Sequence, residues 1–311
     1  MNRVKDAHEV FLAAPASVQV QSVLFGNDFQ SVERAVLSLG RAAELAIGRG
    51  LVSRVELVYG DSSPAPCLTE EQLVVLRGHC TDALSIRYDF FGGNLGSARG
   101  HNRLSGLAET DFIVVQNPDV VVSPRLIISL LQAFTLPAVG MVEAKQLPIE
   151  HPKDYDPITG ETSWASTACA MIPFSLFRRL GGFDADTFFL YCDDVDFSWS
   201  VRLAGYKVIF QASATVFHDK RLSTSGRWQP TNSERYYSAE AALLLAHKWS
   251  RPDIVTKILA AFASDGDEFT SRARDTFEKR RNNGELPEPI DPGHEVGQFV
   301  NGMYGAHRYD L

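Results

Sequence analysis

The chain has 311 residues, enough to bury the core of one large domain with an appendage. Apolar residues make up 45% of it and charged residues 22%, as in an ordinary soluble protein. Its formal net charge of -8 argues against a nucleic-acid partner bound through phosphate neutralisation, and no apolar run approaches the roughly 20 residues that cross a bilayer. Residues 1–16 lack the apolar segment of a signal peptide, and the four cysteines form no CxxC pair. We therefore expect a cytoplasmic protein with reduced thiols.

Strands and helices alternate over the first 120 residues. Short apolar stretches predict strands, separated by turn clusters and by segments with helical spacing: 18–24, 55–59, 84–88 and 112–116. This alternation predicts an α/β fold with a Rossmann-like, mostly parallel sheet and flanking helices. A polar residue follows each strand: Asn27, Asp61, Asn94 and Asp119. Because ligands of parallel sheets bind beyond the carboxyl ends of the strands, these residues predict a nucleotide pocket.

The second half of the chain has a different pattern. Residues 151–163 are polar and contain Gly and Pro, which predicts a mobile loop. Further helices are expected over 173–180 and 193–204, and short strands over 208–210 and 215–217. The apolar spacing then predicts a C-terminal extension of three helices, over 234–249, 254–262 and 268–281. The residues beyond are rich in Pro, Gly and charge and are expected to form a loosely packed tail.

Three carboxylates lie within four positions at the start of the predicted helix 193–204. Asp193, Asp194 and Asp196 directly follow the aromatic run FFLYC. Neighbouring like charges and an apolar wall both raise the pKa of a carboxyl group, which prepares it to accept a proton. Acids at a helix start also complement the helix dipole, so a structural role is the alternative for the cluster alone.

The sequence around this cluster resembles the inverting glycosyltransferases of family two, especially the rhamnosyltransferase-like members. GGFD precedes FFLYCDDVDF, and a basic residue and AGY follow it, as on the acceptor side of that family. The resemblance covers about residues 18–250 and implies a GT-A fold. It implies a catalytic domain over 1–232, with a nucleotide-sugar half over about 18–120 and an acceptor half over about 121–232. Helices over 233–283 and a tail over 284–311 would follow.

The resemblance also implies an activity. A sugar would move, with inversion, from dTDP-rhamnose or a UDP-sugar to a hydroxyl of a polysaccharide or lipid-linked glycan. The protein would work at the inner face of the cytoplasmic membrane, with no transmembrane segment and with peripheral membrane contact left open. Two other functions are weighed. A sugar-phosphate nucleotidyltransferase would carry a Gly-rich basic loop after the first strand, which is missing here. A non-catalytic glycan-binding relative would be expected to lose an acid or the histidine.

Residue roles follow from the positions that match the family. Asp194 inherits the role of the base, with Asp193 beside it, and Asp196 would cap or orient the helix. Asn117-Pro118-Asp119 matches the metal motif, whose common form is Asp-x-Asp, and His218 matches the second protein ligand. Asp119 and His218 would thus hold Mn²⁺ or Mg²⁺ together with the donor diphosphate. The residues implied in donor binding are Asn27, Asp61, Asn94, Gly96, Asn102, Asn117, Asp119 and Arg202, with Asp61 on the nucleobase.

The acceptor side is implied to include Trp164, Thr167 and Asp196. Trp164 would stack on a sugar face or pack in the core, and Arg202 would contact the diphosphate or form a surface ion pair. Thr167 stands where many relatives carry Gly, and of the family's first-strand motif only Asn27 is retained. Both departures leave the donor base and the acceptor open.

Overall fold

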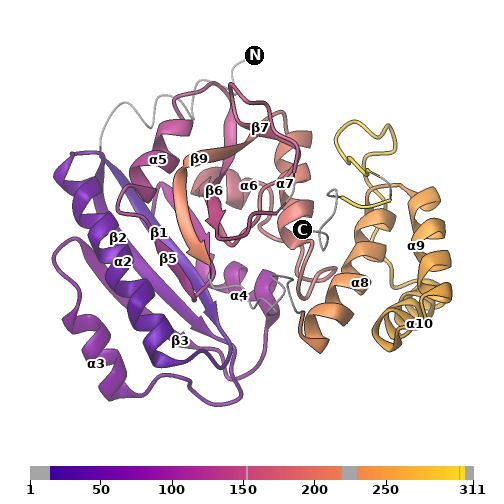
Figure 1. Cartoon of the computed structure of the whole chain (residues 1–311), viewed down its shortest axis with the longest axis horizontal. Coiled ribbons are helices and arrows are strands. Elements are labelled where there is room, and N and C mark those ends of the chain that lie inside the picture. The colour runs from indigo at the N-terminus through magenta and orange to yellow at the C-terminus, as the bar shows by residue number, and fades with distance from the viewer. Residues whose placement is uncertain (1–14, 152, 219–229, 301, 305–311) are drawn as a thin grey trace.

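The computed structural model describes residues 15–151, 153–218, 230–300 and 302–304. The expectations for residues 1–14 and for 305–311 of the tail lie outside these ranges. Figure 1 shows a sheet with helices against it, and a group of three helices beside this body. In the described part of the chain, no helix is long and apolar enough to cross a membrane.

A nine-stranded mixed sheet forms the centre, in the order β3-β2-β1-β4-β8-β6-β9-β5, with β7 paired to β9. Its N-terminal part is parallel, as expected, and consists of β1 (Ala16–Leu24), β2 (Val52–Asp61), β3 (Leu84–Phe90) and β4 (Phe112–Gln116). The direction reverses at β8 (Cys169–Pro173), which is antiparallel to β4 and to β6 (Val139–Leu147). β9 (Lys207–His218) is parallel to β6, whereas β5 (Val120–Val122) and β7 (Glu161–Thr162) are antiparallel to β9. The two short strands predicted over 208–217 are therefore one continuous strand.

The helices flank this sheet, and each begins where the sequence supplies a cap or an apolar face. Asp28 caps α2 (Phe29–Gly48), whose buried stripe includes Val32, Val36 and Leu39 and packs against β2 and β5. The other flanking helices are α3 (Glu70–Gly78), α4 (Gly96–Ser105), α5 (Leu126–Ala133), α6 (Phe174–Arg179) and α7 (Asp193–Leu203). α4 packs against β1 and β2, which places its first turn near the ends of these strands.

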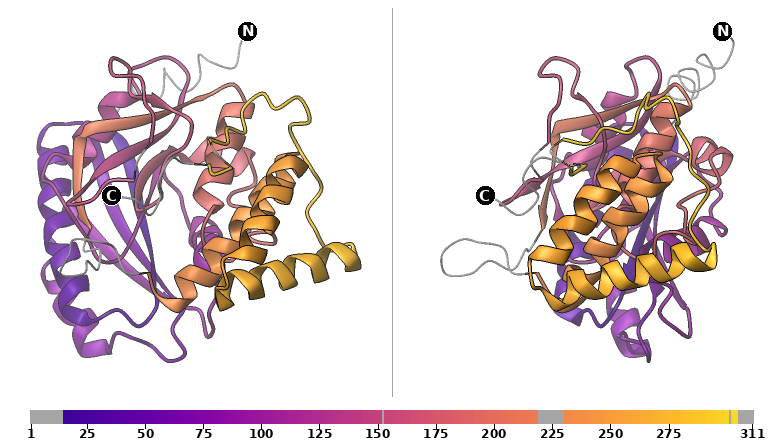
Figure 2. Two further views of the ribbon diagram at one scale, coloured as in Figure 1. Left: turned by 45° about the vertical axis from the view of Figure 1, so that its right-hand side comes forward. Right: turned by 90° about the vertical axis from the view of Figure 1, so that its right-hand side faces the viewer.

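The C-terminal extension consists of α8 (Asn232–Lys248), α9 (Pro252–Ser264) and α10 (Glu268–Asn283), which pack on one another (Figure 2). The tail that follows is largely exposed over its described residues but contacts the body at several points. Its backbone bonds the end of α8, where Ile290 N–H donates to the Lys248 carbonyl at 2.7 Å. Phe299 and Tyr304 join the apolar cluster around Trp199 and Trp249. Burial of these aromatic rings stabilises a segment whose Pro and Gly content alone indicates weak packing.

Candidate active site

The carboxyl ends of β1 to β4 lie at one edge of the sheet, because these four strands are parallel. Hydrogen bonds join the loops that leave this edge. The Ser62 N–H donates to the Leu24 carbonyl at 2.9 Å, and the Gly26 N–H donates to the Ser63 hydroxyl at 2.9 Å. Asn27 follows directly, and its Oδ1 accepts the Phe25 N–H at 2.9 Å. The loops after β1 and β2, which follow the strand ends at Asn27 and Asp61, are thus joined at this border.

Asp61 lies at this border, and its buried carboxylate accepts several hydrogen bonds. It accepts the N–H groups of Ser63 and Cys67, both at 2.8 Å, and the hydroxyl of Tyr88. Burial alone would raise the pKa of Asp61, but these hydrogen bonds outweigh it and hold the pKa below its ordinary value. The carboxylate therefore shapes the loop after β2, and a nucleobase would reach it only by opening this environment.

The first turn of α4 approaches the acidic segment closely. Asn94 caps the turn by accepting the Gly96 N–H at 3.0 Å. Gly96 has a φ of +70°, and a Cβ there would lie 2.3 Å from the Phe189 carbonyl oxygen. Only glycine fits this approach, which lets the Ser97 N–H donate to the same carbonyl at 3.1 Å. Asn102, one helical turn and a half further on, is directed at the backbone of Phe183 instead of the strand ends.

Asp119 and His218 face each other across the β5–β9 pairing. The Asp119 Oδ1 lies 3.7 Å from the His218 Nε2, and the Asn117 Nδ2 lies 3.3 Å from the same nitrogen. The Gln146 Oε1 lies 3.0 Å from the other ring nitrogen, Nδ1. An oxygen at this position selects the tautomer with a proton on Nδ1, which leaves a lone pair on Nε2, the nitrogen that Asn117 and Asp119 face.

This pair fits a divalent cation. Two ligands that each lie about 2.1 Å from one ion are about 3–4 Å apart, and 3.7 Å falls in that range. Over the described ranges, no group of three or more His, Cys, Asp or Glu side chains could hold a metal. Any ion held here would therefore need further oxygen ligands from a substrate or water, as Mg²⁺ commonly takes.

The acid pair begins α7 behind a strained turn. Tyr191 and Cys192 have φ values of +67° and +57°, a left-handed conformation that costs a residue with a side chain roughly 1–2 kcal/mol. Asp193 is buried, and burial and the charge of Asp194 raise its pKa to about 7, against the effect of the Ser97 hydroxyl. Its Oδ2 has no hydrogen-bond partner among the described residues. Asp194 is half-buried, and its Oδ1 accepts the Val195 N–H at 2.9 Å.

Three of the predicted site residues contact other parts of the protein in the structure. Arg202 is at the far end of α7, where its Nη1 donates to the Val296 carbonyl of the tail at 2.8 Å. Trp164 is 4% exposed and packs against Tyr304 at 5.4 Å between ring centroids, so its ring is not open for a sugar. Asp196 is buried and bonds the end of α8. Thr167, in contrast, is half-buried and precedes Ala168, whose carbonyl accepts the Asn117 N–H at 3.0 Å.

A buried ion pair beside the acids was missed in the sequence. Lys153 reaches Glu143 on β6, and the two side chains are 2% and 0% exposed. The Lys153 Nζ also lies 3.9 Å from the centroid of the Trp164 ring. Burial raises the pKa of Glu143 to about 7, although Lys153 opposes this. Lys153 thus anchors the early part of the loop predicted over 151–163, whereas residues 154–158 are exposed.

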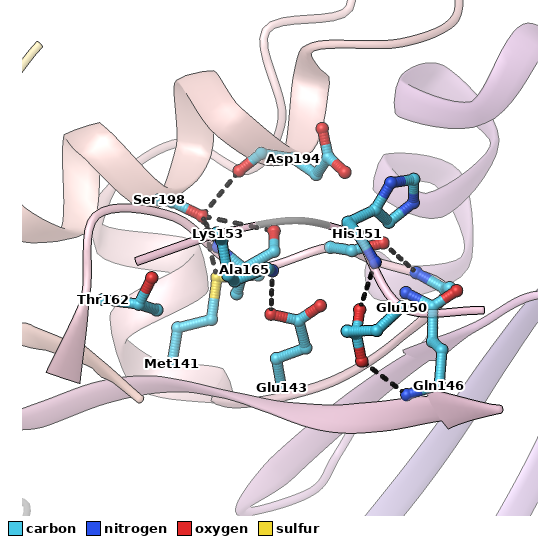
Figure 3. Close-up of polar contacts among 12 residues, drawn as sticks. Met141, Glu143, Gln146, Glu150, His151, Lys153, Thr162, Ala165, Asp194 and Ser198 are labelled. Atoms are coloured by element: carbon cyan, nitrogen blue, oxygen red, sulfur yellow. Dashed lines mark hydrogen bonds and ion pairs between the residues drawn. The ribbon is translucent and has the colours of Figure 1, made fainter. Parts of the chain in front are cut away.

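Figure 3 shows how this anchor adjoins the acid helix. The Ser198 hydroxyl donates to the Asp194 carbonyl at 2.7 Å and accepts the Ala165 N–H at 3.0 Å. The first turn of α7 is therefore joined to the backbone of Ala165, which directly follows Trp164. The acid in the apolar stretch GMVEAKQ was the signal for Glu143, because a carboxylate inside a buried strand needs a partner.

Comparison with solved structures defines the class of the protein. A UDP-, GalNAc- and Mn²⁺-bound structure of GalNAc-T7 superposes with a TM-score of 0.59 at 12% identity, over 88% of this chain and 56% of that one. The mannosyltransferase PcManGT of Pyrobaculum calidifontis, solved with GDP-Man and Mn²⁺, gives a TM-score of 0.55 at 16% identity, over 91% and 85%. The chain has the GT-A glycosyltransferase fold.

Within that class, the chain is similar in sequence to proteins named rhamnosyltransferases. It is 27% identical over 180 residues to the N-acetylglucosaminyl-diphospho-decaprenol L-rhamnosyltransferase of Mycobacterium tuberculosis, covering 43% of this chain and 58% of the relative. It is 25% identical over 172 residues to the rhamnosyltransferase WbbL of Escherichia coli, covering 44% and 65%. The match thus spans less than two thirds of either relative. No protein-family model matches the chain.

Proposed function

We propose that this protein is an inverting glycosyltransferase that moves a sugar from a nucleotide-sugar donor to a hydroxyl group. The observation that carries the proposal is the contact between the two halves of the site. In the first turn of α4, the Ser97 N–H donates to the Phe189 carbonyl at 3.1 Å, and Gly96 approaches the same carbonyl closely, four residues before Asp193. The glycine-containing helix start at the strand ends and the acid pair of α7 therefore form one site.

The acid pair would supply the base. Asp194 is the better exposed of the two and takes the proton of the acceptor hydroxyl. That oxygen then bonds the anomeric carbon as the bond from this carbon to the diphosphate oxygen breaks on the opposite face, which inverts the configuration. Asp193 lies beside Asp194, and burial and the charge of Asp194 raise the pKa of Asp193 to about 7.

The leaving diphosphate would be bound beside Asp119 and His218. These two residues would hold Mn²⁺ or Mg²⁺, and the ion would neutralise charge on the diphosphate. Gln146 fixes the ring tautomer of His218, and an ion on Nε2 would replace the contact that the Asn117 amide makes with this nitrogen at 3.3 Å. The donor is proposed to be dTDP-rhamnose or a UDP-sugar, since the similar curated proteins are named rhamnosyltransferases. The acceptor is proposed to be a polysaccharide or a lipid-linked glycan, by analogy with the mycobacterial relative.

The structure disfavours the nucleotidyltransferase alternative in one respect. The loop after β1 runs Phe25-Gly26-Asn27-Asp28, with no basic side chain to bind a triphosphate, and Asp28 is used to cap α2. Thermal-shift measurements with a panel of nucleotide sugars and Mn²⁺ test the proposal, because a ligand that binds the native state raises its stability. We expect one nucleotide sugar to raise the melting temperature more than its free sugar does. A panel without any stabilising nucleotide sugar would contradict the proposal.

A further inference from the structure

We infer that Lys248, the last residue of α8, is a positioning residue that holds the acid pair of α7 in place. The effect of Lys248 on turnover is inferred from the proposed function. Its effect on the structure is inferred from geometry alone. The Lys248 Nζ lies 2.7 Å from the Asp184 Oδ2 and 2.8 Å from the Asp196 Oδ2. These two aspartates are the ends of segment 184–196, which carries the strained turn and both acids.

The contacts made by Lys248 are buried and therefore strong. The lysine side chain is 13% exposed, against 4% for Asp196 and 27% for Asp184. Burial alone would lower the pKa of Lys248, but Asp196 and Asp184 raise it above its ordinary value. A buried charge-assisted pair is costly to break, because the remaining partner is left charged without compensation.

The neighbouring residue strengthens the same contact. Trp249 is fully buried, and its Nε1 donates to the Asp196 Oδ1 at 2.9 Å. Both oxygens of Asp196 are thus bonded to the end of α8. Asp196 is three residues after Asp193, and its N–H donates to the Cys192 carbonyl at 2.8 Å. The contacts of Lys248 and Trp249 with Asp196 therefore act on the first turn of α7, directly at the acid pair.

The strained turn explains why the contacts of Lys248 with Asp184 and Asp196 are needed. Left-handed Tyr191 and Cys192 persist only where the surroundings fix the backbone on both sides. On one side Asp184 accepts the Thr187 N–H at 3.1 Å and the Lys248 ammonium. On the other side Asp196 accepts the same ammonium. Lys248 thus joins the residues before and after the strained turn. Through this contact, the C-terminal extension supports the backbone that carries the acid pair.

Hydrogen exchange tests the structural half of the inference without a substrate. In Lys248→Met, the amides of residues 188–196 should exchange at least about tenfold faster, while those of β1 and β4 keep their protection. Lys257→Met, which removes an exposed lysine from α9, is the matched control and should leave both regions unchanged. Unchanged exchange over 188–196 in Lys248→Met would overturn the inference, and so would an equal loss of protection throughout the sheet.

Steady-state kinetics with the donor that wild type uses tests the functional half. Displacement of the acids by about 1 Å should lower kcat by roughly 10²-fold, with the donor KM within about twofold of wild type. Lys248→Arg keeps a cation between the two carboxylates and should regain most of this loss. An unchanged kcat in Lys248→Met, or a rise in donor KM alone, would contradict a positioning role. If wild-type protein releases no nucleoside diphosphate from any donor, the proposed function fails, and the exchange data alone decide whether Lys248 holds the segment.

Discussion

Asn102 bonds the backbone of Phe183 through both atoms of its side-chain amide. Its Nδ2 donates to the Phe183 carbonyl at 2.7 Å, and its Oδ1 accepts the Phe183 N–H at 2.9 Å. A Cβ on Gly182 would lie 2.5 Å from the same Oδ1, so glycine is required beside the amide. One side chain of α4 thereby fixes the turn that precedes segment 184–196. The asparagine implied in donor binding thus has a structural role in the geometry described here.

Replacement of Asn102 by Ala should therefore lower stability. Phe183 is 3% exposed, and its backbone N–H would lose its partner, whereas its carbonyl would keep only the Ala185 N–H at 2.9 Å. Unsatisfied buried polar groups cost about 1–3 kcal/mol in the free energy of unfolding, which chemical denaturation can measure. Asn282→Ala, on the exposed surface of α10, is the control and should change stability little. A stability of Asn102→Ala equal to that of the control would show that the two hydrogen bonds are not formed in solution.

The acid pair should make stability depend on pH. Burial chiefly raises the pKa of Asp193 from its ordinary value of 3.8 to about 7. Below pH 3.8 the folded and unfolded states are both protonated at this carboxyl, and the stability it contributes is fully present. As pH rises toward 7 and beyond, the unfolded state ionises first, so this stability is lost.

Asp193→Asn should abolish that loss, because an amide does not ionise. The melting temperature of Asp193→Asn should exceed that of wild type at pH 8, and the gap should narrow as the pH is lowered to 5. Asp275→Asn, an aspartate that is largely exposed on α10, serves as the control and should show no such trend. A gap that widens on acidification would show that the pKa of Asp193 is lowered in the folded protein.

The buried pair of Glu143 and Lys153 gives a third prediction. Lys153→Met leaves the Glu143 carboxylate buried without its cation, which should cost about 3–5 kcal/mol at pH 8. The cost should shrink at pH 5, where Glu143 is protonated in the folded state, since its pKa is already about 7. The double variant Glu143→Gln/Lys153→Met should recover most of the stability, as measured by chemical denaturation.

The same segment offers a matched control for this pair. Lys207 and Glu161 are 2.8 Å apart and 40% and 43% exposed, so Lys207→Met should cost at most about 1 kcal/mol. Proteolysis should cut segment 151–163 faster in Lys153→Met than in Lys207→Met. Equal cutting in the two variants would show that the buried pair does not anchor the segment.

Much of the catalytic fold could be predicted from the sequence, because its elements have local signals. The four parallel strands, the polar residues at their ends and a helix from Asp193 follow from apolar spacing and turn residues. The contacts that position the acids have no such signal. Lys248 is 64 residues from Asp184 and 52 from Asp196, and no local pattern relates side chains so far apart in the chain.

The tail and the segment 151–163 show a second limit of sequence reasoning. Both contain Pro, Gly and charged residues, a composition typical of mobile loops. In the structure, Phe299 packs on Trp199 with ring centroids 5.2 Å apart, and Lys153 is buried. A few buried side chains are sufficient to anchor such a segment. The average composition of the segment does not show which side chains these are.

The pair of Asp119 and His218 predicts coupled binding of metal and nucleotide. With two protein ligands, the ion should bind weakly alone and tightly with the diphosphate. Mn²⁺ and nucleoside diphosphate should therefore tighten each other by the same factor in calorimetry. Asp119→Asn should reduce this coupling, whereas Asp82→Asn, on an exposed turn, should preserve it. Nucleotide affinity that is the same with Mn²⁺ and with EDTA would contradict the assignment of these two residues.

The most direct test of the account is release of nucleoside diphosphate from the stabilising nucleotide sugar, measured with Mn²⁺ in wild type and in Asp194→Asn. The account predicts that wild type releases nucleoside diphosphate and that acceptor accelerates this release. In Asp194→Asn, turnover should fall by roughly 10²–10⁴-fold with donor affinity little changed, since the variant loses the base and keeps its shape. A larger loss in Asp193→Asn would move the role of base to Asp193. Release of pyrophosphate, or turnover retained by both variants in folded form, would contradict glycosyl transfer by this acid pair.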